Sequence, residues 1–252
     1  ISRSLDTMKM TTNEEVVEGI ILKKTVYKEN DMILHIYTKE YGKIGIIARG
    51  IRKITSKNAR ACQEMMISEM SINLKKGLSS LMKATPVDYL RHIKENLDSE
   101  IVANYVLEYF YRYLEDNNPN QDEYDILYHS LKALDHGYSP LLVYLLFNVF
   151  VLNHNGVSID VEGCVVCGSS KVTAISLRDG GFVCQNHRGN LQPCDINVLK
   201  AFRHIHKIPI QYIDHIHIEE NILKELIPYM NGYIEEYTGV SLKTSAFIQQ
   251  IV

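Results

Sequence analysis

Apolar and polar residues alternate along the first third of the chain with the two-residue period of β-strands. Runs rich in Ile, Val, Tyr or Met follow one another at 16–24, 31–38, 43–49, 66–74 and 78–85. Gly42 and Gly77 supply turns between neighbouring runs. Five strands in so short a stretch, with a longer break after the third, favour a small closed barrel of the OB type over residues 16–86. An SH3-like barrel would give nearly the same pattern and stays an alternative.

From residue 98 onward, the apolar period changes to that of an α-helix. Apolar and aromatic pairs recur every four residues between Ile101 and Leu114, and Asn117-Asn118-Pro119 ends the run. Further helices are predicted at 122–136, 141–154, 195–206 and 222–237. The second of these four is apolar nearly all round, so we expect it at the centre of a helical domain.

A stretch of different character, 161–194, interrupts the helical pattern. The sequence therefore predicts an α+β multi-domain protein with an N-terminal OB-type β-barrel and a C-terminal all-α domain. The all-α domain is expected to comprise residues 87–160 and 195–252, with 161–194 as an insertion between them.

The beginning of the chain shows no predicted element, and residues 1–15 are expected to be a flexible N-terminus. Because the sequence does not start with Met, we interpret Met8 or Met10 as the natural start and the preceding residues as a remnant of expression. The longest apolar stretch, 141–152, is too short to span a bilayer. Five cysteines without a secretory leader indicate a reducing, cytoplasmic location.

The inserted segment contains two knuckles, CxxC and CxxH, on either side of a predicted hairpin. Ligands spaced two apart can face inward from a tight loop, so one structural Zn²⁺ could be held by Cys164, Cys167, Cys184 and His187. This is the outline of a zinc ribbon. A cytosolic disulfide pair is the competing interpretation, and Cys194 could replace His187 as fourth ligand. Cys62 has no partner motif and is expected to be a small buried hydrophobe.

The net charge of −3 conceals an uneven distribution of charge. Residues 1–83 carry 15 Lys and Arg against 9 Asp and Glu, whereas residues 84–252 carry 12 against 21. Such asymmetry between the two parts of a chain indicates that the basic part meets a polyanion.

The strongest concentration of positive charge lies between Glu40 and Glu64, which enclose no other acid. The six cations of this stretch are Lys43, Arg49, Arg52, Lys53, Lys57 and Arg60. Lys and Arg on a loop beside a barrel would neutralise phosphates without sequence preference, and Gly50 would let the backbone approach the ligand. Tyr27 and Tyr41, at strand ends, could stack on bases. The alternative is a solvated loop whose charges only maintain solubility.

The sequence contains no P-loop, no GxSxG nucleophile elbow and no HExxH motif. A zinc with four protein ligands leaves no open position for water or substrate, so its expected role is structural. Two HxH pairs, His204/His206 and His215/His217, could suggest a second metal. The first pair would diverge in a helix, and the second could converge on a strand but lacks a third ligand. We therefore expect a protein without enzymatic activity.

Several of these stretches occur in the order found in a known family. They are Glu18–Lys23, Glu29–Leu34, Thr38–Lys43, Ala48–Lys53, the Cys164–Gly168 knuckle and the Gly180–Cys184 return. In this order the chain resembles the bacterial RecO family of recombination mediators, from about Val16 to the last predicted helix. The helical regions match only in period and length.

The resemblance implies an OB-fold that binds single- and double-stranded DNA and anneals complementary strands, and hence a protein associated with the nucleoid. It also implies a partnership with RecR that helps RecA onto DNA coated with single-strand-binding protein (SSB). Many members have Cys at the fourth ligand position, where this chain has His187. No membrane partner is implied.

Members of the family also bind the acidic, hydrophobic C-terminal tail of SSB on their helical domain. A cationic site for such a tail could be formed by Lys200, Arg203 and Lys207, which fall on one face of the predicted helix beside Phe202. A solvated helix face is the alternative.

Three hypotheses about function remain at this point. The first is a non-enzymatic DNA-binding and annealing mediator of recombination. The second is a zinc-ribbon protein-interaction module whose barrel binds RNA or protein. The third, a metal-dependent hydrolase, would require a zinc ion with an open coordination position.

Overall fold

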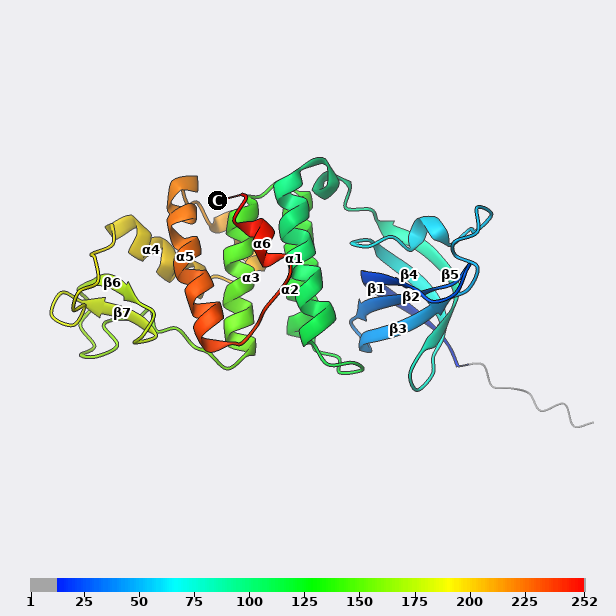
Figure 1. Ribbon diagram of the computed structural model, residues 1–252, viewed down its shortest axis with the longest axis horizontal. Coiled ribbons are helices and arrows are strands. Elements are labelled where there is room, and N and C mark those ends of the chain that lie inside the picture. The colour runs from blue at the N-terminus through cyan, green and yellow to red at the C-terminus, as the bar shows by residue number, and fades with distance from the viewer. Residues whose placement is uncertain (1–12, 252) are drawn as a thin grey trace, which may run out of the picture. The chain divides into compact units, whose positions relative to one another are not determined.

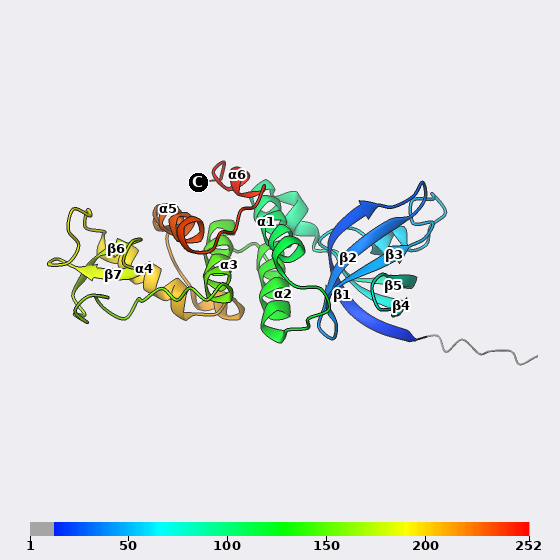
Figure 2. The same cartoon turned by 60° about the horizontal axis from the view of Figure 1, so that its bottom comes forward.

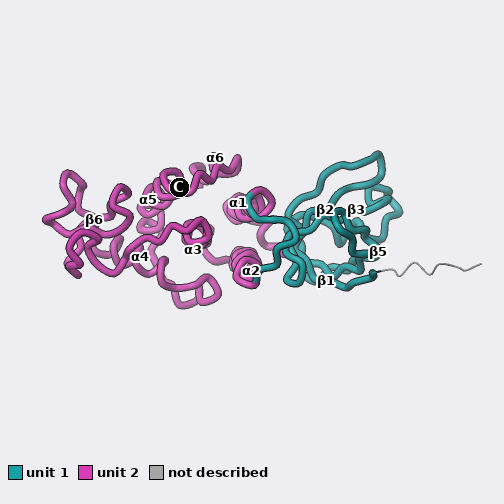
Figure 3. Tube along the Cα trace, turned by 90° about the horizontal axis from the view of Figure 1, so that it is seen from below, with its two compact units in different colours: residues 1–89, 113–120 teal, residues 90–112, 121–252 magenta. Residues whose placement is uncertain are grey.

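The computed structural model describes residues 13–251 (Figure 1). It contains two compact units, shown in different colours in Figure 3. The barrel unit comprises the chain up to Tyr89 together with Tyr113–Asn120, and the helical unit comprises Leu90–Arg112 and the chain from Gln121 onward. The expected starts at Met8 and Met10 lie outside the described residues. Glu14, which was expected in the flexible N-terminus, instead begins the first strand.

The sheet of the barrel unit has five strands: β1 (Glu14–Val26), β2 (Met32–Thr38), β3 (Gly42–Ala48), β4 (Ile67–Asn73) and β5 (Ser79–Asp88). They are hydrogen-bonded in the order β1-β2-β3-β5-β4, and pairing of β1 with β4 closes the sheet. All pairs are antiparallel except β3 with β5. The predicted five strands and the helices that follow them are confirmed.

The first strand, β1, is long because it pairs with two neighbouring strands. Its first part pairs with β4 up to Ile20, and its second part pairs with β2 from Gly19 onward. The register shifts between Ile21 and Lys23, and such a bulge lets a strand bend from one partner to the next. This bend brings the two ends of the sheet together.

Alternation of apolar and polar residues produces the core of the barrel. Side chains on one face of each strand point inward, and residues such as Leu34, Ile36 and Met70 are completely buried. Cys62 belongs to this core, as the sequence indicated. Burial raises the pKa of the Cys62 thiol to about 12, although Lys24 nearby opposes the shift, so this cysteine stays a neutral core residue.

A segment from the middle of the chain also belongs to the barrel unit. Helix α1 (Leu97–Tyr113) ends four residues before Asn117, and the chain then pairs with β3. Lys43 and Asp116 form a parallel bridge, the Asn117 N–H donates to the Lys43 carbonyl at 2.9 Å, and the Lys43 ammonium lies 3.2 Å from the Asp116 carboxylate. The sequence pattern did not predict this return, because a short irregular segment has no periodicity.

The helical unit contains α1 up to Arg112, α2 (Gln121–Asp135), α3 (Pro140–His154), α4 (Ile196–Lys207), α5 (Glu220–Tyr237) and α6 (Ser245–Ile248). Short 3₁₀ turns occur at η1 (Ala59–Ala61) in the barrel unit and at η2 (Arg91–Glu95) and η3 (Ile210–His215) in the helical unit. The four predicted helices after α1 are confirmed to within two residues at each end. None of the described helices combines the length and hydrophobicity that crossing a membrane requires.

Helix α3 occupies the centre of the helical unit, with α2 and α5 on either side of it (Figures 1 and 2). It is buried along nearly its whole length, as its apolar sequence predicts. Its buried Asn148 is satisfied, because the Tyr105 hydroxyl donates to Asn148 Oδ1 at 2.8 Å and Asn148 Nδ2 donates to the Tyr144 carbonyl. Asn148 is therefore paired, whereas the buried Ser130 hydroxyl on α2 has no hydrogen-bond partner among the described residues.

The inserted segment forms a hairpin of β6 (Val172–Ser176) and β7 (Gly181–Cys184), which lies beside α4 (Figure 1). Helix α4 follows the insertion, and its predicted cap is present, since Asp195 Oδ1 accepts from the Asn197 N–H at 2.7 Å.

His206, near the end of α4, is half-buried in an unusual environment for a titratable group. Its ring lies 4.5 Å from that of Phe202, and its Nε2 atom is buried without a hydrogen-bond partner in the part of the chain that the structure describes. Desolvation by burial lowers the pKa of His206 to about 4. The folded protein therefore holds this imidazole in its neutral form.

This burial should make stability depend on pH. An unfolded His206 titrates near pH 6.5 and the folded one near pH 4, so the unfolded state binds more protons between these values. The free energy of unfolding should therefore fall as the pH decreases, by about 2 kcal/mol between pH 7 and pH 5 from this residue alone. Urea unfolding at both pH values should show that His206→Gln loses this part of the pH dependence.

His217→Gln, a change at an exposed histidine of the same unit, is the matched control and should behave like the unchanged protein. An unaltered pH dependence in His206→Gln would contradict the assignment.

Candidate metal centre and basic loop

The two knuckles of the insertion are shaped by backbone hydrogen bonds around the cysteines. The Gly168 N–H donates to the Cys164 carbonyl at 2.7 Å, and the His187 N–H donates to the Cys184 carbonyl at 3.0 Å. Gly168 has a φ of +70°, a left-handed conformation that residues with a side chain rarely adopt. The glycine after the CxxC motif therefore closes the first knuckle and turns its side chains toward the second.

Four ligand atoms converge between the knuckles. The Sγ atoms of Cys167 and Cys184 are 3.8 Å apart, and His187 Nδ1 lies 3.5 Å from Cys164 Sγ and 3.3 Å from Cys184 Sγ. All four atoms lie within 4.8 Å of one another. A tetrahedral zinc, with Zn–S near 2.3 Å and Zn–N near 2.0 Å, has S···S edges of about 3.8 Å and S···N edges of about 3.5 Å. The cluster therefore has nearly the dimensions of a zinc site.

The geometry distinguishes between the two candidates for the fourth ligand. His187 lies with the three thiols, whereas Cys194 lies apart, with its Sγ 3.4 Å from the Tyr229 hydroxyl on α5. The described cysteines form no disulfide. Among the described residues, the two HxH pairs also form no group that could hold a second metal.

The electrostatics of the thiols also suit a cation. Burial opposes ionisation of Cys164, but hydrogen bonds with the Cys184, Val166 and Cys167 backbone outweigh it and lower the pKa of its thiol to about 6. For Cys167, the backbone of Ser169 favours the thiolate, yet burial and the neighbouring sulfurs raise the pKa. One thiolate thus forms readily, and its negative charge disfavours ionisation of the next thiol. A bound divalent cation would compensate this charge.

The hairpin is held to the helices by aromatic packing. Phe182 on β7 is fully buried, and its ring centroid lies 5.8 Å from that of Phe202 on α4, which in turn stacks on Tyr233 of α5 at 6.1 Å. The Tyr233 hydroxyl donates to the Ser176 carbonyl at 2.9 Å. The insertion itself contributes only a few buried apolar side chains, so it depends on these contacts and on its ligand cluster.

Two of the three cations predicted to receive an acidic tail take part in the same attachment. The Arg203 guanidinium donates to the Val161 carbonyl at 2.7 Å and lies over the Phe182 ring, and Lys207 pairs with Glu162 at 2.7 Å. These contacts fix the start of the insertion to α4. Lys200 is exposed on the same helix. Arg203 and Lys207 therefore have an evident structural role, which distinguishes them from Lys200.

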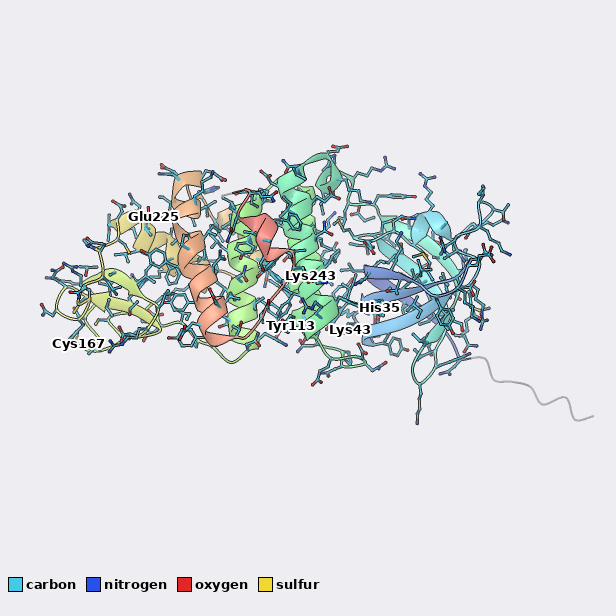
Figure 4. The ribbon with its side chains drawn as sticks, in the orientation of Figure 1. His35, Lys43, Tyr113, Cys167, Glu225 and Lys243 are labelled. Atoms are coloured by element: carbon cyan, nitrogen blue, oxygen red, sulfur yellow. The ribbon has the colours of Figure 1, made fainter. Side chains whose placement is uncertain are left out.

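The six cations of the predicted basic stretch do not all lie on one segment of the structure. Five of its cations lie on the loop between β3 and β4, and all five are exposed: Arg49, Arg52, Lys53, Lys57 and Arg60. We call residues 49–60 the basic loop. Lys43 lies instead on β3, only 8% exposed and paired with Asp116 (Figure 4). It lies on the same face as His35, whose pKa is lowered by burial and by Lys23 and Lys43, against the attraction of Asp116.

Hydrogen bonds hold the basic loop to the barrel at both ends. Near its start, the Gly50 N–H donates to Asp31 Oδ1 at 2.8 Å, and the Arg52 N–H donates to the Asn30 carbonyl at 3.1 Å. Near its end, Asn58 Oδ1 accepts from the Ala84 N–H at 3.1 Å. Gly50, with φ of +63°, makes the turn that leads into the loop. The cations are therefore presented on a fixed backbone.

The two tyrosines considered for base stacking lie at opposite ends of β2. Tyr27 is 47% exposed in the β1–β2 turn that anchors the basic loop, and Lys28 lies over its ring. Tyr41 is half-buried in the β2–β3 turn, in a cavity of about 440 Å³ with the 74–77 hairpin. A strand of seven residues separates these ends by about 20 Å. Of these two tyrosines, Tyr27 is the neighbour of the loop. Tyr89 also contacts the loop, since the Arg60 guanidinium lies 5.3 Å from the centroid of its ring.

These features define an α+β protein in which a closed five-stranded barrel presents an exposed cationic loop and a helical unit carries a Cys₃His cluster. A family model described as "Recombination protein O N terminal" matches residues 10–90, and one described as "Recombination protein O C terminal" matches residues 94–246. The chain belongs to this family, known as RecO.

Curated relatives agree with this assignment. The DNA repair protein RecO of Bacillus pumilus (strain SAFR-032) is 28% identical over 241 residues, which cover 93% of each chain. The DNA repair protein RecO of Bacillus mycoides (strain KBAB4) is 28% identical over 243 residues, covering 93% of this chain and 96% of that one. Family membership supports a role as a recombination mediator in DNA repair.

If the cluster holds a metal ion, removal of one ligand should release the ion and loosen the insertion. Cys167→Ser should lower the metal content measured by elemental analysis from about one ion per chain to near zero. It should also lower the melting temperature by roughly 5–10 °C, because binding of a structural metal contributes to folding. Cys194→Ser, outside the cluster, should retain the metal. A metal-free unchanged protein with the same stability in chelator would contradict the assignment.

Proposed function

We propose that this protein is a non-enzymatic mediator of recombination that binds single- and double-stranded DNA and promotes annealing of complementary strands. In this proposal it acts with RecR to help RecA onto SSB-coated single-stranded DNA, close to the chromosome in the cytoplasm. The observation that carries the proposal is the basic loop, where five exposed cations occur without an acid. Family membership supports the same role.

The loop is suited to phosphate rather than to base recognition. Its cations lie along the backbone of one irregular segment, whereas sequence readout needs side chains placed in a groove on a helix or a strand pair. Lys and Arg that neutralise phosphates release counterions, which gives affinity that depends on salt and not on sequence. A protein that anneals any pair of complementary strands requires binding of this kind.

The barrel fits the OB type. OB-folds are five-stranded Greek-key barrels that bind oligonucleotides on the face of strands 2 and 3 and through neighbouring loops. The order β1-β2-β3-β5-β4 and the long bent β1 agree with that architecture. The basic loop starts at the end of β3 and is anchored on the β1–β2 turn, so Tyr27 would lie beside the bound strand and supply a stacking surface.

The Cys₃His cluster would hold one structural Zn²⁺. Four protein ligands complete a tetrahedral site and leave no position for a substrate, and soft thiolates with imidazole are the donor set that zinc prefers. The ion would stabilise an insertion whose own apolar core is small. We propose no catalytic step for it.

Helix α4 offers a site for the acidic C-terminal tail of SSB. A cavity of about 330 Å³ near its end is lined by apolar residues such as Leu146, Phe150 and Ile205, and also by charged residues of both signs, Lys207, Asp122 and Asp125. Lys200 and Lys207, seven residues and about 10 Å apart along the helix, would face the acidic part of the tail. Lys200 is the better candidate, because Lys207 is paired with Glu162.

A zinc-ribbon interaction module whose barrel binds RNA or protein is the second candidate function. It shares the cluster and the fold, and differs in what the basic loop contacts. Strand annealing separates the two, because an RNA-specific or protein-specific barrel would not accelerate pairing of complementary DNA strands.

A salt titration tests the loop directly. If all five cations contact phosphates of single-stranded DNA, log Kd should change with log salt with a slope of magnitude about 3.5, since each contact contributes about 0.7. Lys53→Gln with Lys57→Gln should weaken binding of any DNA sequence equally and reduce this magnitude by about 1.4. Fluorescence anisotropy with a labelled oligonucleotide measures both quantities.

Lys75→Gln with Lys76→Gln makes the same charge change at the Tyr41 end of the barrel and is the matched control. It should leave the slope unchanged. Equal effects of the two double variants would mean that charge acts only globally, and a response independent of salt would remove the proposed function.

Lys200→Glu should weaken binding of a fluorescent peptide with the sequence of the SSB tail by about 3- to 10-fold, because it replaces attraction by repulsion. Lys171→Glu, at an exposed position in the insertion, should have little effect. Unchanged peptide affinity in Lys200→Glu would exclude α4 as the tail site.

A further inference from the structure

One apolar residue lies at the tip of the basic loop. Ile54 is completely exposed, at 105%, and no other large apolar residue in the described part of the chain approaches this value, since Leu97 follows at 69%. Single exposed apolar side chains are common on protein surfaces and by themselves have no meaning. Ile54 differs from these because cations lie on both sides of it in the loop.

Local conformation does not explain an isoleucine here. Ile54 is the second residue of a turn closed by the Ser56 N–H, which donates to the Lys53 carbonyl at 2.9 Å. Turns favour Gly, Pro, Asn, Asp and Ser, whereas a β-branched residue suits strands. A residue that fits neither its local conformation nor its solvent exposure is typical of a functional position.

The tip is fixed before any ligand binds. A preceding turn, in which the Lys53 N–H donates to the Gly50 carbonyl at 3.1 Å, leads directly into the turn that carries Ile54. The anchors at Asp31 and Asn58 hold both ends of the loop on the barrel. These hydrogen bonds define the backbone of the tip in the free protein, which would limit the conformational entropy lost when Ile54 enters a binding partner.

The surroundings of Ile54 define the chemistry of that partner. Arg52, Lys53 and Lys57 are exposed within three residues of it, and no acid lies on the loop. The partner must therefore present an apolar surface about as wide as one side chain, flanked on both sides by negative charge. The edge of a base step between two sugar-phosphate backbones has this arrangement, and Ile is among the residues that proteins insert there.

We propose that Ile54 is an apolar wedge that inserts between adjacent base pairs of duplex DNA held by the basic loop and partly unstacks them. This inference rests on the proposed function. The cations would hold the backbones on either side, while the side chain of Ile54 exchanges its water contacts for contacts with base faces. An unstacked step is a point where paired strands open more readily, as a protein that acts on strand pairing would need.

Duplex DNA with 2-aminopurine in place of adenine provides the test, because its fluorescence increases when the base is unstacked. Binding of the unchanged protein should increase the signal, and Ile54→Ser should bind with about 3- to 10-fold lower affinity and without the increase. The salt dependence of Ile54→Ser should stay the same, because no phosphate contact is lost. Ile54→Leu should retain the signal.

Val16→Ser is the matched control, since Val16 is 64% exposed on β1 and far from the loop in sequence. It should behave like the unchanged protein. Heparin, a polyanion without bases, should bind Ile54→Ser and the unchanged protein equally.

An unaltered 2-aminopurine signal and affinity in Ile54→Ser would overturn the wedge and leave the proposed function intact. So would binding to anionic phospholipid vesicles or to RecR that depends on Ile54 while DNA binding does not. Absence of DNA binding by the unchanged protein would remove both the wedge and the proposed function.

Discussion

Mutual repulsion among the cations of the basic loop is the constraint that the surrounding barrel has to overcome. Five positive side chains within twelve residues, without an acid between them, favour an expanded loop in solution. The hydrogen bonds of Asp31 with Gly50 and of Asn58 with Ala84 oppose this expansion by fixing the loop to the β1–β2 turn and to β5. The same anchors place Tyr27 and Ile54 beside the cations, so a phosphate backbone and the bases attached to it could be contacted together.

The helical unit contains an insertion with only a few buried apolar side chains of its own, so other contacts have to stabilise it. Phe182 connects the hairpin to the aromatic core of α4 and α5, and Arg203 and Lys207 fix the start of the insertion. In the Cys₃His cluster, the pKa of the Cys164 thiol is lowered and that of the Cys167 thiol is raised, so a bound cation would favour ionisation of both. The ligand cluster, aromatic packing and ion pairs thus act on one small segment.

Periodicity predicted most of the fold, because strands and helices bury one face at a fixed spacing. The five strands, the apolar α3 and the knuckles could all be derived from the sequence. The return of 113–120 to the barrel could not, since its bridge at Lys43 depends on a contact between distant residues. For the same reason, the sequence grouped Lys43 with the loop cations, although Lys43 is paired with Asp116 on the barrel. It also grouped Arg203 with Lys200, although Arg203 is bound to the start of the insertion. Only the structure showed that His187, and not Cys194, lies with the three thiols, and that Ile54 is fully exposed.

The basic loop, and not the barrel in general, should contact the phosphates of DNA. Lysine acetylation read by mass spectrometry, with and without a saturating oligonucleotide, tests it residue by residue. DNA should protect Lys53 and Lys57 and leave Lys75 and Lys76 as reactive as in the free protein. Protection of Lys75 and Lys76, with Lys53 and Lys57 still reactive, would place the DNA elsewhere and contradict the account.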